Sequence, residues 1–89
     1  MNKIKNKRIL ITGSCGTVGS ELIKQLLTNN KYDPKEVIGI DNNESQLFFQ
    51  DSHYADEERA SFYVADICDR DVLMRKMHNI DVVIHAAAL

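Results

Sequence analysis

Runs of consecutive apolar residues recur along this chain and predict its β-strands. The runs are short, and polar or turn-forming residues bound them, as is typical of strands buried on both faces of a parallel sheet. The four expected strands are residues 8–12, 37–41, 62–66 and 81–89. Asp33 and Pro34 mark the turn before the second run.

Between these runs, apolar residues recur at the three- and four-residue spacing of an α-helix. A first helix is expected to begin near Thr17 and to end near residues 29–30. Its apolar positions are Val18, Leu22, Ile23, Leu26 and Leu27. A second, shorter helix is expected at residues 43–50, with Leu47 and Phe48 directed toward the sheet.

A third helix is expected between the last two strands, with Asp69 as its N-cap. Its apolar positions are Val72, Leu73, Met77 and Ile80. The polar residues 53–60 show no clear periodicity and are expected to form a surface connection. Strands that alternate with helices indicate an α/β fold with right-handed crossovers. We therefore expect the first half of a Rossmann-type doubly wound parallel sheet, with its four strands in the order 3-2-1-4.

Composition narrows the functional classes. The chain has 89 residues, 44% of them hydrophobic and 27% charged, with a formal net charge of -2, which fits a single globular domain. The slight acidity argues against a nucleic-acid partner, and no apolar run approaches the length of a membrane span. Cys15 and Cys68 are far apart and lack the spacing of metal ligands, so no metal and a reduced, cytoplasmic setting are expected.

A glycine-spaced turn joins the first expected strand to the first helix. Gly13 is expected to allow the sharp bend, Gly16 to let a pyrophosphate approach the backbone, and Gly19 to pack the helix against the strand. The helix N-terminus adds a partial positive charge at the same point. The residues expected to bind the cofactor here are Gly13, Ser14, Cys15, Gly16, Thr17, Val18 and Gly19.

Two alternatives apply to this turn. It could merely join strand and helix, although that role does not require three glycines in this register. It could bind a triphosphate, but the chain lacks the Gly-Lys-Ser/Thr sequence of a P-loop. Within the turn, Cys15 is either a reactive thiol or, more simply, a small neutral filler.

Asp41 ends the second expected strand, where dinucleotide-binding folds place the carboxylate that accepts hydrogen bonds from the adenosine ribose. Its charge repels a 2′-phosphate, and the neutral Asn42 and Asn43 that follow add no cation to hold one. NAD is therefore expected in preference to NADP, with Asp41, Asn42 and Asn43 as contacts. In the alternative interpretation, Asp41 only ends a strand and begins a turn.

Small and polar residues end the third and fourth expected strands. Asp66 is expected to accept a hydrogen bond from the adenine amino group, beside the backbone of Ile67. Small side chains after the last strand leave room for the cofactor. The contacts expected there are Ala86, Ala87 and Ala88. The alternatives are that Asp66 caps a turn and that His85 is a core histidine with satisfied hydrogen bonds.

The last expected strand indicates that residues 1–89 are part of a larger unit. Apart from Asp81 at its start, the strand is long and apolar. A chain that stopped at Leu89 would therefore leave an unpaired, aggregation-prone sheet edge. Doubly wound folds normally continue through further strands. We therefore expect the N-terminal part of an NAD(P)-binding domain, with the catalytic and substrate-binding regions beyond Leu89.

These motifs together resemble the extended short-chain dehydrogenase/reductase superfamily, which contains nucleotide-sugar epimerases and dehydratases. The matching segments are residues 12–19, Asp41, residues 65–67 and residues 85–88. They span nearly the whole chain. The sequence is most similar to the polysaccharide-biosynthesis branch, typified by UDP-N-acetylglucosamine 4,6-dehydratase. The segments that carry this finer resemblance are residues 16–22, 41–48 and 85–89.

The resemblance implies a redox-neutral dehydration of a UDP-sugar with a retained nicotinamide, in a homo-oligomer when full length. In the family, the Tyr of a Tyr-X-X-X-Lys pair removes the proton of the sugar C4 hydroxyl. Tyr32, Tyr54 and Tyr63 each lack a Lys four residues on, so none is expected to be this base and residues 1–89 alone are expected to be inactive. A 4-epimerase or reductase of the same superfamily and a non-catalytic cofactor-sensing protein are the alternatives.

Overall fold

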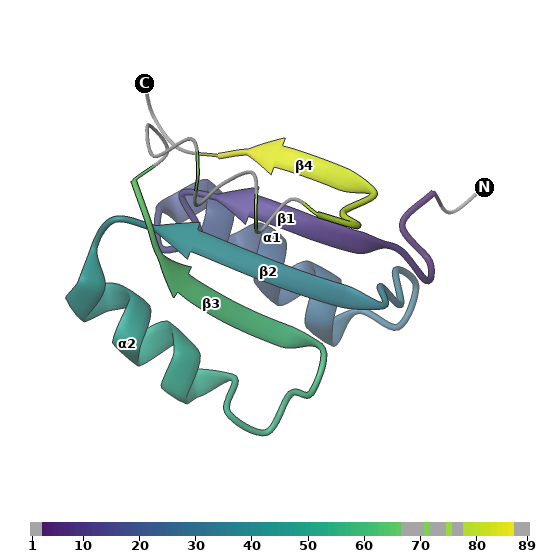
Figure 1. Cartoon of the computed structure of the whole chain (residues 1–89). Helices are drawn as coiled ribbons and strands as arrows, with labels where there is room; N and C mark the ends of the chain where they lie inside the picture. The colour runs from purple at the N-terminus through teal and green to yellow at the C-terminus, as the bar shows by residue number, and fades with distance from the viewer. Residues whose placement is uncertain (1–2, 67–70, 72–74, 76–77, 87–89) are drawn as a thin grey trace.

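The fold is built on a sheet of four parallel strands in the order β3-β2-β1-β4 (Figure 1). The computed structural model describes residues 3–66, 71, 75 and 78–86. The strands are β1 (Arg8–Thr12), β2 (Glu36–Asp41), β3 (Ala60–Val64) and β4 (Val82–His85). This order confirms the predicted Rossmann-type topology. Because the strands are parallel, their carboxyl ends meet at one edge of the sheet.

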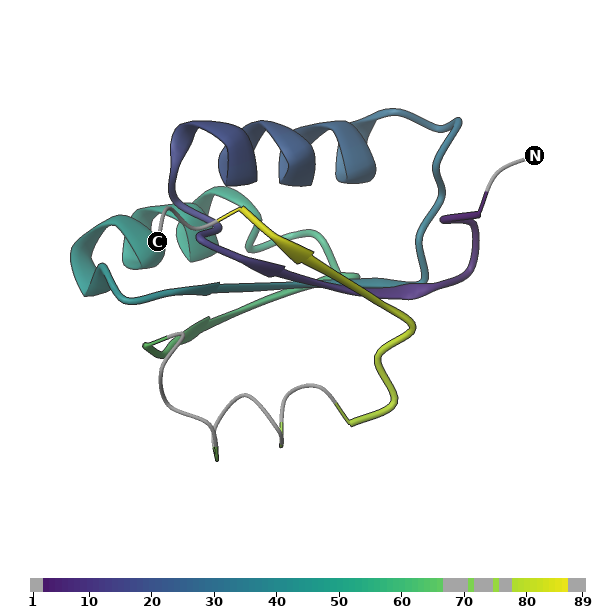
Figure 2. The same cartoon turned by 90° about the horizontal axis from the view of Figure 1, so that it is seen from above.

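Two helices, α1 (Thr17–Thr28) and α2 (Glu44–His53), cover the same face of this sheet (Figure 2). From α1, Ile23, Leu26 and Leu27 are buried in one core cluster with Ile9 and Ile11 of β1. This helix follows the periodicity read from the sequence. None of the helices in the described part of the chain is both long and apolar enough to cross a membrane.

The opposite face of the sheet carries a second, smaller core. Leu10, Ile38 and Ile40 are buried there with Ala65, and Ile80 packs against them. The alternation of side chains along β1 explains the division, because successive residues of a strand point to opposite faces. Most of the third predicted helix, including Asp69, Val72, Leu73 and Met77, lies outside the described residues, and of its predicted apolar positions only Ile80 is described.

Four apolar residues are more exposed than their patterns predict. Val18, expected on the apolar side of the first helix, is 61% exposed in the first turn of α1. Phe48 was expected to face the sheet, but it is 67% exposed, and Leu47 alone is buried among the residues of α2. Tyr63 and Val64, expected in a buried strand, are 37% and 53% exposed, because β3 is an outer strand of the described sheet.

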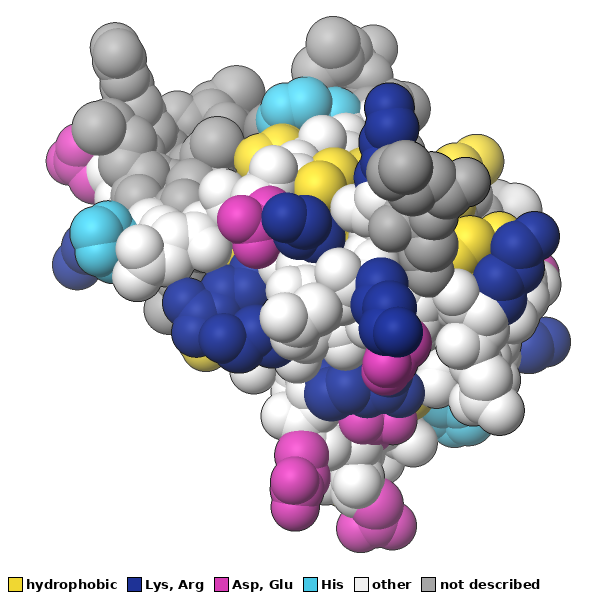
Figure 3. Space-filling view, turned by 90° about the vertical axis from the view of Figure 1, so that its right-hand side faces the viewer, with side chains coloured by type: hydrophobic (Ala, Val, Ile, Leu, Met, Phe, Trp, Pro, Cys, Tyr) yellow, Lys and Arg dark blue, Asp and Glu magenta, His cyan; other side chains and the backbone are white. Residues whose placement is uncertain are grey.

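Charged residues gather where the strands begin. Figure 3 views the molecule from this side, where Lys and Arg lie interspersed with Asp and Glu. Arg8 and Glu36 begin β1 and β2, and Nε of Arg8 lies 3.9 Å from Oε1 of Glu36. Arg59, just before β3, donates to Glu57 at 2.8 Å and to the carbonyl of Leu27 near the end of α1 at 2.9 Å. The contacts of Arg59 join α1 to the start of β3.

Candidate functional site

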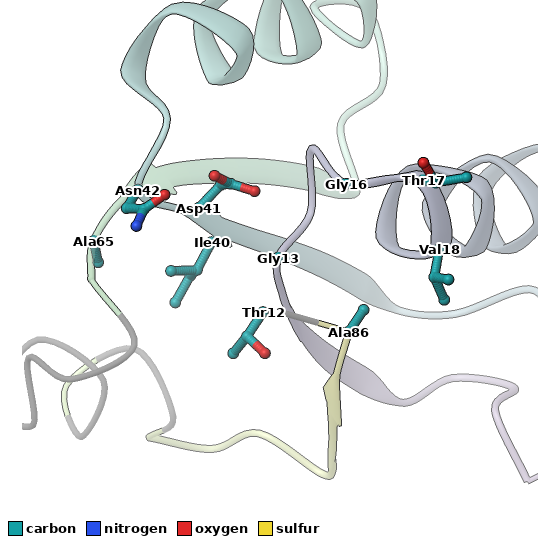
Figure 4. A pocket seen from close by; sticks show the side chains of 10 residues that line it. All are labelled: Thr12, Gly13, Gly16, Thr17, Val18, Ile40, Asp41, Asn42, Ala65 and Ala86. Atoms are coloured by element: carbon teal, nitrogen blue, oxygen red, sulfur yellow. The ribbon is translucent and has the colours of Figure 1, made fainter. Parts of the chain in front are cut away.

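A cavity of about 370 Å³ opens at the edge of the sheet where the strands end (Figure 4). The ends of β1 and β2, the glycine turn and the first turn of α1 all contribute to its wall. The lining residues are Thr12, Gly13, Gly16, Thr17, Val18, Ile40, Asp41, Asn42, Ala65 and Ala86. Parallel α/β folds bind their ligands at this edge. The cavity is therefore the candidate functional site.

The turn between β1 and α1 holds a backbone conformation that glycine favours. Gly13 has φ of 72°, in the left-handed region. The N–H groups of Gly13 and Ser14 both donate to the carbonyl of Ile40, at 2.8 and 3.1 Å, which anchors the turn to β2. The N–H of Gly16 donates to the carbonyl of Gly13 at 3.1 Å and closes the bend. The chain thus turns from β1 into α1, and Gly13 and Gly16 expose only backbone to the cavity.

Gly19 lies on the side of α1 that faces this turn. A Cβ at Gly19 would overlap the carbonyl oxygen of Gly13 and lie 2.9 Å from the carbonyl carbon. A Cβ at Gly16 would lie 3.4 Å from the same oxygen, an ordinary contact. Gly19 therefore permits close packing of helix and turn, whereas Gly16 leaves the cavity open. The packing role of Gly19 agrees with the role that the spacing predicts, and the role predicted for Gly16, close approach of a pyrophosphate, stays a prediction.

The N-terminus of α1 borders the cavity and has no side-chain cap. Gly16 occupies the N-cap position, and the first turn of α1 contains no acidic residue. Thr17 and Val18 follow it in the cavity wall. The first N–H groups of a helix lack partners inside the helix, and they carry its partial positive charge. By contrast, Asn43 caps α2 by accepting the N–H of Gln46 at 3.1 Å. Of these two helices, α1 therefore offers free donors to an anion in the cavity.

The Asp41 carboxylate stands beside the turn at the end of β2, with its side chain at the cavity (Figure 4). Its Oδ2 accepts the N–H of Cys15 at 3.0 Å, and its Oδ1 accepts the N–H of Asn43 at 2.9 Å. A carboxylate has about four lone-pair sites. The two backbone bonds fix the orientation of the group and leave each oxygen able to accept one more donor, such as a hydroxyl.

The Cys15 side chain contacts helix α2. Its Sγ donates to Oε1 of Gln50 at 3.4 Å. Burial raises the pKa of the Cys15 thiol, and the negative charge of Asp41 raises it further. A raised pKa keeps the thiol protonated and poorly nucleophilic at neutral pH. This environment favours the interpretation of Cys15 as a neutral filler of the turn.

The predicted contact residues fall into three groups. Seven of them line the cavity: Gly13, Gly16, Thr17, Val18, Asp41, Asn42 and Ala86. The others that are described lie around it. Ser14 is buried, Cys15 contacts Gln50, Gly19 packs against Gly13, the Asn43 side chain caps α2, and Asp66 is exposed outside the lining set. The predicted contacts Ile67, Ala87 and Ala88 lie outside the described residues.

Thr12, Ile40 and Ala65 also line the cavity and were not among the predicted contacts, although Thr12 and Ala65 lie in segments that carry the family resemblance. All three lie at or near the carboxyl ends of β1, β2 and β3. Their position at the ends of predicted parallel strands is the sequence signal that could have identified them as lining residues. Thr12 also contacts His85, the last residue of β4, with 3.1 Å between Oγ1 and Nδ1. This bond and the bond from the N–H of Ala86 to the carbonyl of Thr12, at 3.0 Å, join β1 to β4 at the cavity.

Comparison with curated proteins gives related sequences of much greater length. The chain is 41% identical over 88 residues to an uncharacterized membrane protein of Methanocaldococcus jannaschii, a match that covers 99% of this chain and 25% of that protein. It is 35% identical over 83 residues to a UDP-N-acetylglucosamine 4,6-dehydratase (inverting) of Campylobacter jejuni, a match that covers 93% of this chain and 24% of that enzyme. The chain spans about a quarter of the length of these relatives.

Comparison with solved structures gives the same fold. Pen from Bacillus thuringiensis matches with a TM-score of 0.85 and 30% identity, over 97% of this chain and 26% of that one. The dTDP-glucose 4,6-dehydratase of Bacillus anthracis, solved in complex with NAD, matches with a TM-score of 0.75 and 21% identity, over 93% of this chain and 27% of that one. At this lower identity the likeness concerns the fold alone.

A sequence profile accounts for most of the chain. Residues 9–89 match the profile of the family described as polysaccharide biosynthesis protein. This range contains both described helices, all of the sheet except Arg8, and every residue that lines the cavity. The chain therefore belongs to the polysaccharide biosynthesis protein family.

Proposed function

We propose that this chain binds the nicotinamide dinucleotide, NAD in preference to NADP, of an enzyme that modifies nucleotide sugars for polysaccharide biosynthesis. The reaction we infer is the 4,6-dehydration of a UDP-N-acetylhexosamine, which the relative from Campylobacter jejuni carries out according to its name. In this proposal, residues 1–89 are the N-terminal part of the cofactor-binding domain of a cytoplasmic homo-oligomer. The acid/base residues and the sugar pocket belong to other parts of the protein.

The observation that carries the proposal is the uncapped N-terminus of α1 at the glycine-lined cavity. A pyrophosphate carries negative charge and accepts hydrogen bonds, and backbone N–H groups at a helix N-terminus suit it. Gly16 has no side chain, so the space that a Cβ would fill at this position remains part of the cavity. Thr17 and Val18 border the same space. We assign the pyrophosphate to this part of the cavity.

Asp41 supports NAD as the preferred cofactor. Its carboxylate is held at the cavity by two backbone donors and keeps capacity to accept ribose hydroxyls. A 2′-phosphate at the same position would meet a negative charge, and the adjacent Asn42 in the cavity wall is neutral. The same carboxylate thus favours a free 2′-hydroxyl and disfavours its phosphorylated form.

The nicotinamide, when bound, would accept and return hydride, and the chain's own residues would bind and orient the dinucleotide. None of the three tyrosines in the chain has a Lys four residues later. Tyr54 stacks on Phe62, with ring centroids 5.8 Å apart. Burial raises the pKa of its hydroxyl, with Glu21 adding to the effect, which makes Tyr54 less suited to act as a base. We therefore assign no acid/base step to this chain.

Calorimetric titration of the complete protein with NAD and NADP tests the proposal. We expect saturable binding of NAD and weaker binding of NADP. In Asp41→Asn, the affinity for NAD should fall by about tenfold to a hundredfold, as for a lost charge-assisted hydrogen bond. The preference for NAD over NADP should shrink as well.

The matched control is Asp51→Asn, which removes the same charge from an exposed position of α2. Its affinities should equal those of the unaltered protein. Absence of binding to either dinucleotide, or equal losses in the two variants, would contradict the proposal.

A further inference from the structure

Gln50 is a half-buried polar residue on α2 that contacts the glycine turn 36 positions earlier in the chain. Its Nε2 donates to the carbonyl of Ser14 at 2.7 Å. Its Oε1 accepts from Sγ of Cys15 at 3.4 Å. Gln50 does not line the cavity, so it has no place among the cofactor contacts described above.

The Gln50 amide holds one end of a peptide unit whose other end is held by Asp41. The carbonyl of Ser14 and the N–H of Cys15 belong to the same peptide plane, and they point in opposite directions because the peptide is trans. Gln50 donates a hydrogen bond to the carbonyl at 2.7 Å, and Asp41 accepts one from the N–H at 3.0 Å. Rotation of this plane by a half-turn would break both bonds and direct the carbonyl oxygen of Ser14 at the Asp41 carboxylate.

We propose that Gln50 is a positioning residue for the dinucleotide: by holding the Ser14–Cys15 peptide, it keeps the turn in the conformation that receives the pyrophosphate. This inference rests on the proposed function. The clamped peptide lies between Gly13 and Gly16, both of which line the cavity. A change of its orientation therefore moves the two backbone segments on which close approach of the pyrophosphate depends. Gln50 acts through the turn and touches no ligand itself.

A pair of near-isosteric variants tests this role in the complete protein. Gln50→Met keeps the length of the side chain and removes the amide. Gln50→Glu keeps the shape but places a carboxylate oxygen against the carbonyl of Ser14. We expect the affinity for NAD to fall about tenfold in Gln50→Met and further in Gln50→Glu, since each leaves the Ser14 carbonyl without its donor. The matched control is Gln46→Met, one turn earlier on the same helix, which should bind NAD like the unaltered protein.

A second ligand separates positioning from a merely structural role. Adenine lacks both the pyrophosphate and the ribose that Asp41 would hold, so its affinity, measured by NMR titration, should change less than about twofold in Gln50→Met. An equal loss of affinity for NAD and adenine, or no loss for NAD, would overturn the inference. A lower melting temperature of the variant would not rescue it. If the unaltered protein bound no dinucleotide, the proposed function would fail and this role with it. Binding by the unaltered protein and by Gln50→Met with equal affinity would overturn the positioning role alone.

Discussion

The α-carbon of Gly19 faces the carbonyl group of Gly13 so closely that a Cβ on Gly19 would overlap the Gly13 oxygen. Ser14 lies just behind, with its Cα 3.1 Å from the same Cβ position. All three atoms in the way belong to the backbone, which cannot rotate aside as a side chain can. The helix and the turn are therefore in contact without any side chain between them.

Gly19→Ala should destabilise the protein more than a usual small-to-large change in the helix. The added methyl group must push α1 away from the turn, which we expect to lower the free energy of unfolding by about 3 kcal/mol. Chemical denaturation of the complete protein followed by circular dichroism would measure the loss. A Gly19→Ala protein as stable as the unaltered one would show that the contact relaxes at little cost.

Gly16→Ala is the counterpart, because the same chemical change falls where there is space. The Cβ would lie 3.4 Å from the nearest atom, and φ at Gly16 is -71°, which alanine adopts readily. We expect the free energy of unfolding to change by less than about 1 kcal/mol. The affinity for NAD should nevertheless fall about tenfold, because the methyl group narrows the approach to the backbone. Titration calorimetry and a melting curve on the same sample would check both parts; unchanged affinity would remove Gly16 from the site.

Because of Glu57, the free energy of unfolding should depend on pH in the acid range. A hydrogen bond from Arg59 lowers the pKa of Glu57 in the folded protein. A carboxylate with a lowered pKa stabilises the fold at pH values above its unfolded pKa of about 4.3, and this contribution is lost as the pH falls through the folded pKa. Glu57→Gln should therefore cost about 0.5–1 kcal/mol at pH 7 and much less below pH 4.

Urea denaturation at a series of pH values would show this convergence of Glu57→Gln with the unaltered protein. The control is Glu58→Gln, at the exposed neighbouring position. Its effect should be small at every pH. A constant difference between Glu57→Gln and the unaltered protein from pH 7 to pH 3 would contradict the assignment.

Cys15 should react slowly with alkylating reagents. Burial and the charge of Asp41 raise the pKa of its thiol, which lowers the fraction of reactive thiolate at pH 8. Iodoacetamide labelling, followed at the Cys15 peptide by mass spectrometry, should be several-fold slower in the folded protein than in urea. Asp41→Asn should speed the folded reaction, because it removes one of the two causes. Equal rates in the folded and unfolded protein would show that the thiol is neither buried nor influenced by Asp41.

Most of the fold followed from the sequence because β1 and α1 carry simple patterns. The strands of the central sheet are short apolar runs, and α1 places Ile23, Leu26 and Leu27 on one side of a helix. In α2 the pattern is ambiguous, since three adjacent apolar residues span about 200° of a helix and cannot all face a sheet. Leu47 is buried while its neighbours Phe48 and Phe49 are 67% and 69% exposed.

The candidate site was less accessible to sequence reasoning wherever a role depends on distant contacts. The glycines and Asp41 could be identified because they occupy fixed places relative to strands. Gln50 could not, since a polar residue on an amphipathic helix ordinarily indicates a solvated face. Its partners, the Ser14 carbonyl and the Cys15 thiol, come close only when α2 folds back over the sheet.

The central place of β1 has a consequence for the time scale on which the site can open. This strand pairs with β2 on one side and β4 on the other, and Ile9, Leu10 and Ile11 have no exposed surface. Its amide protons should therefore exchange with solvent only in the largest opening events, whereas those of α2 exchange through smaller, more frequent ones. The glycine turn begins where this slowly exchanging strand ends, so its first half should persist through fluctuations that release the contact with α2.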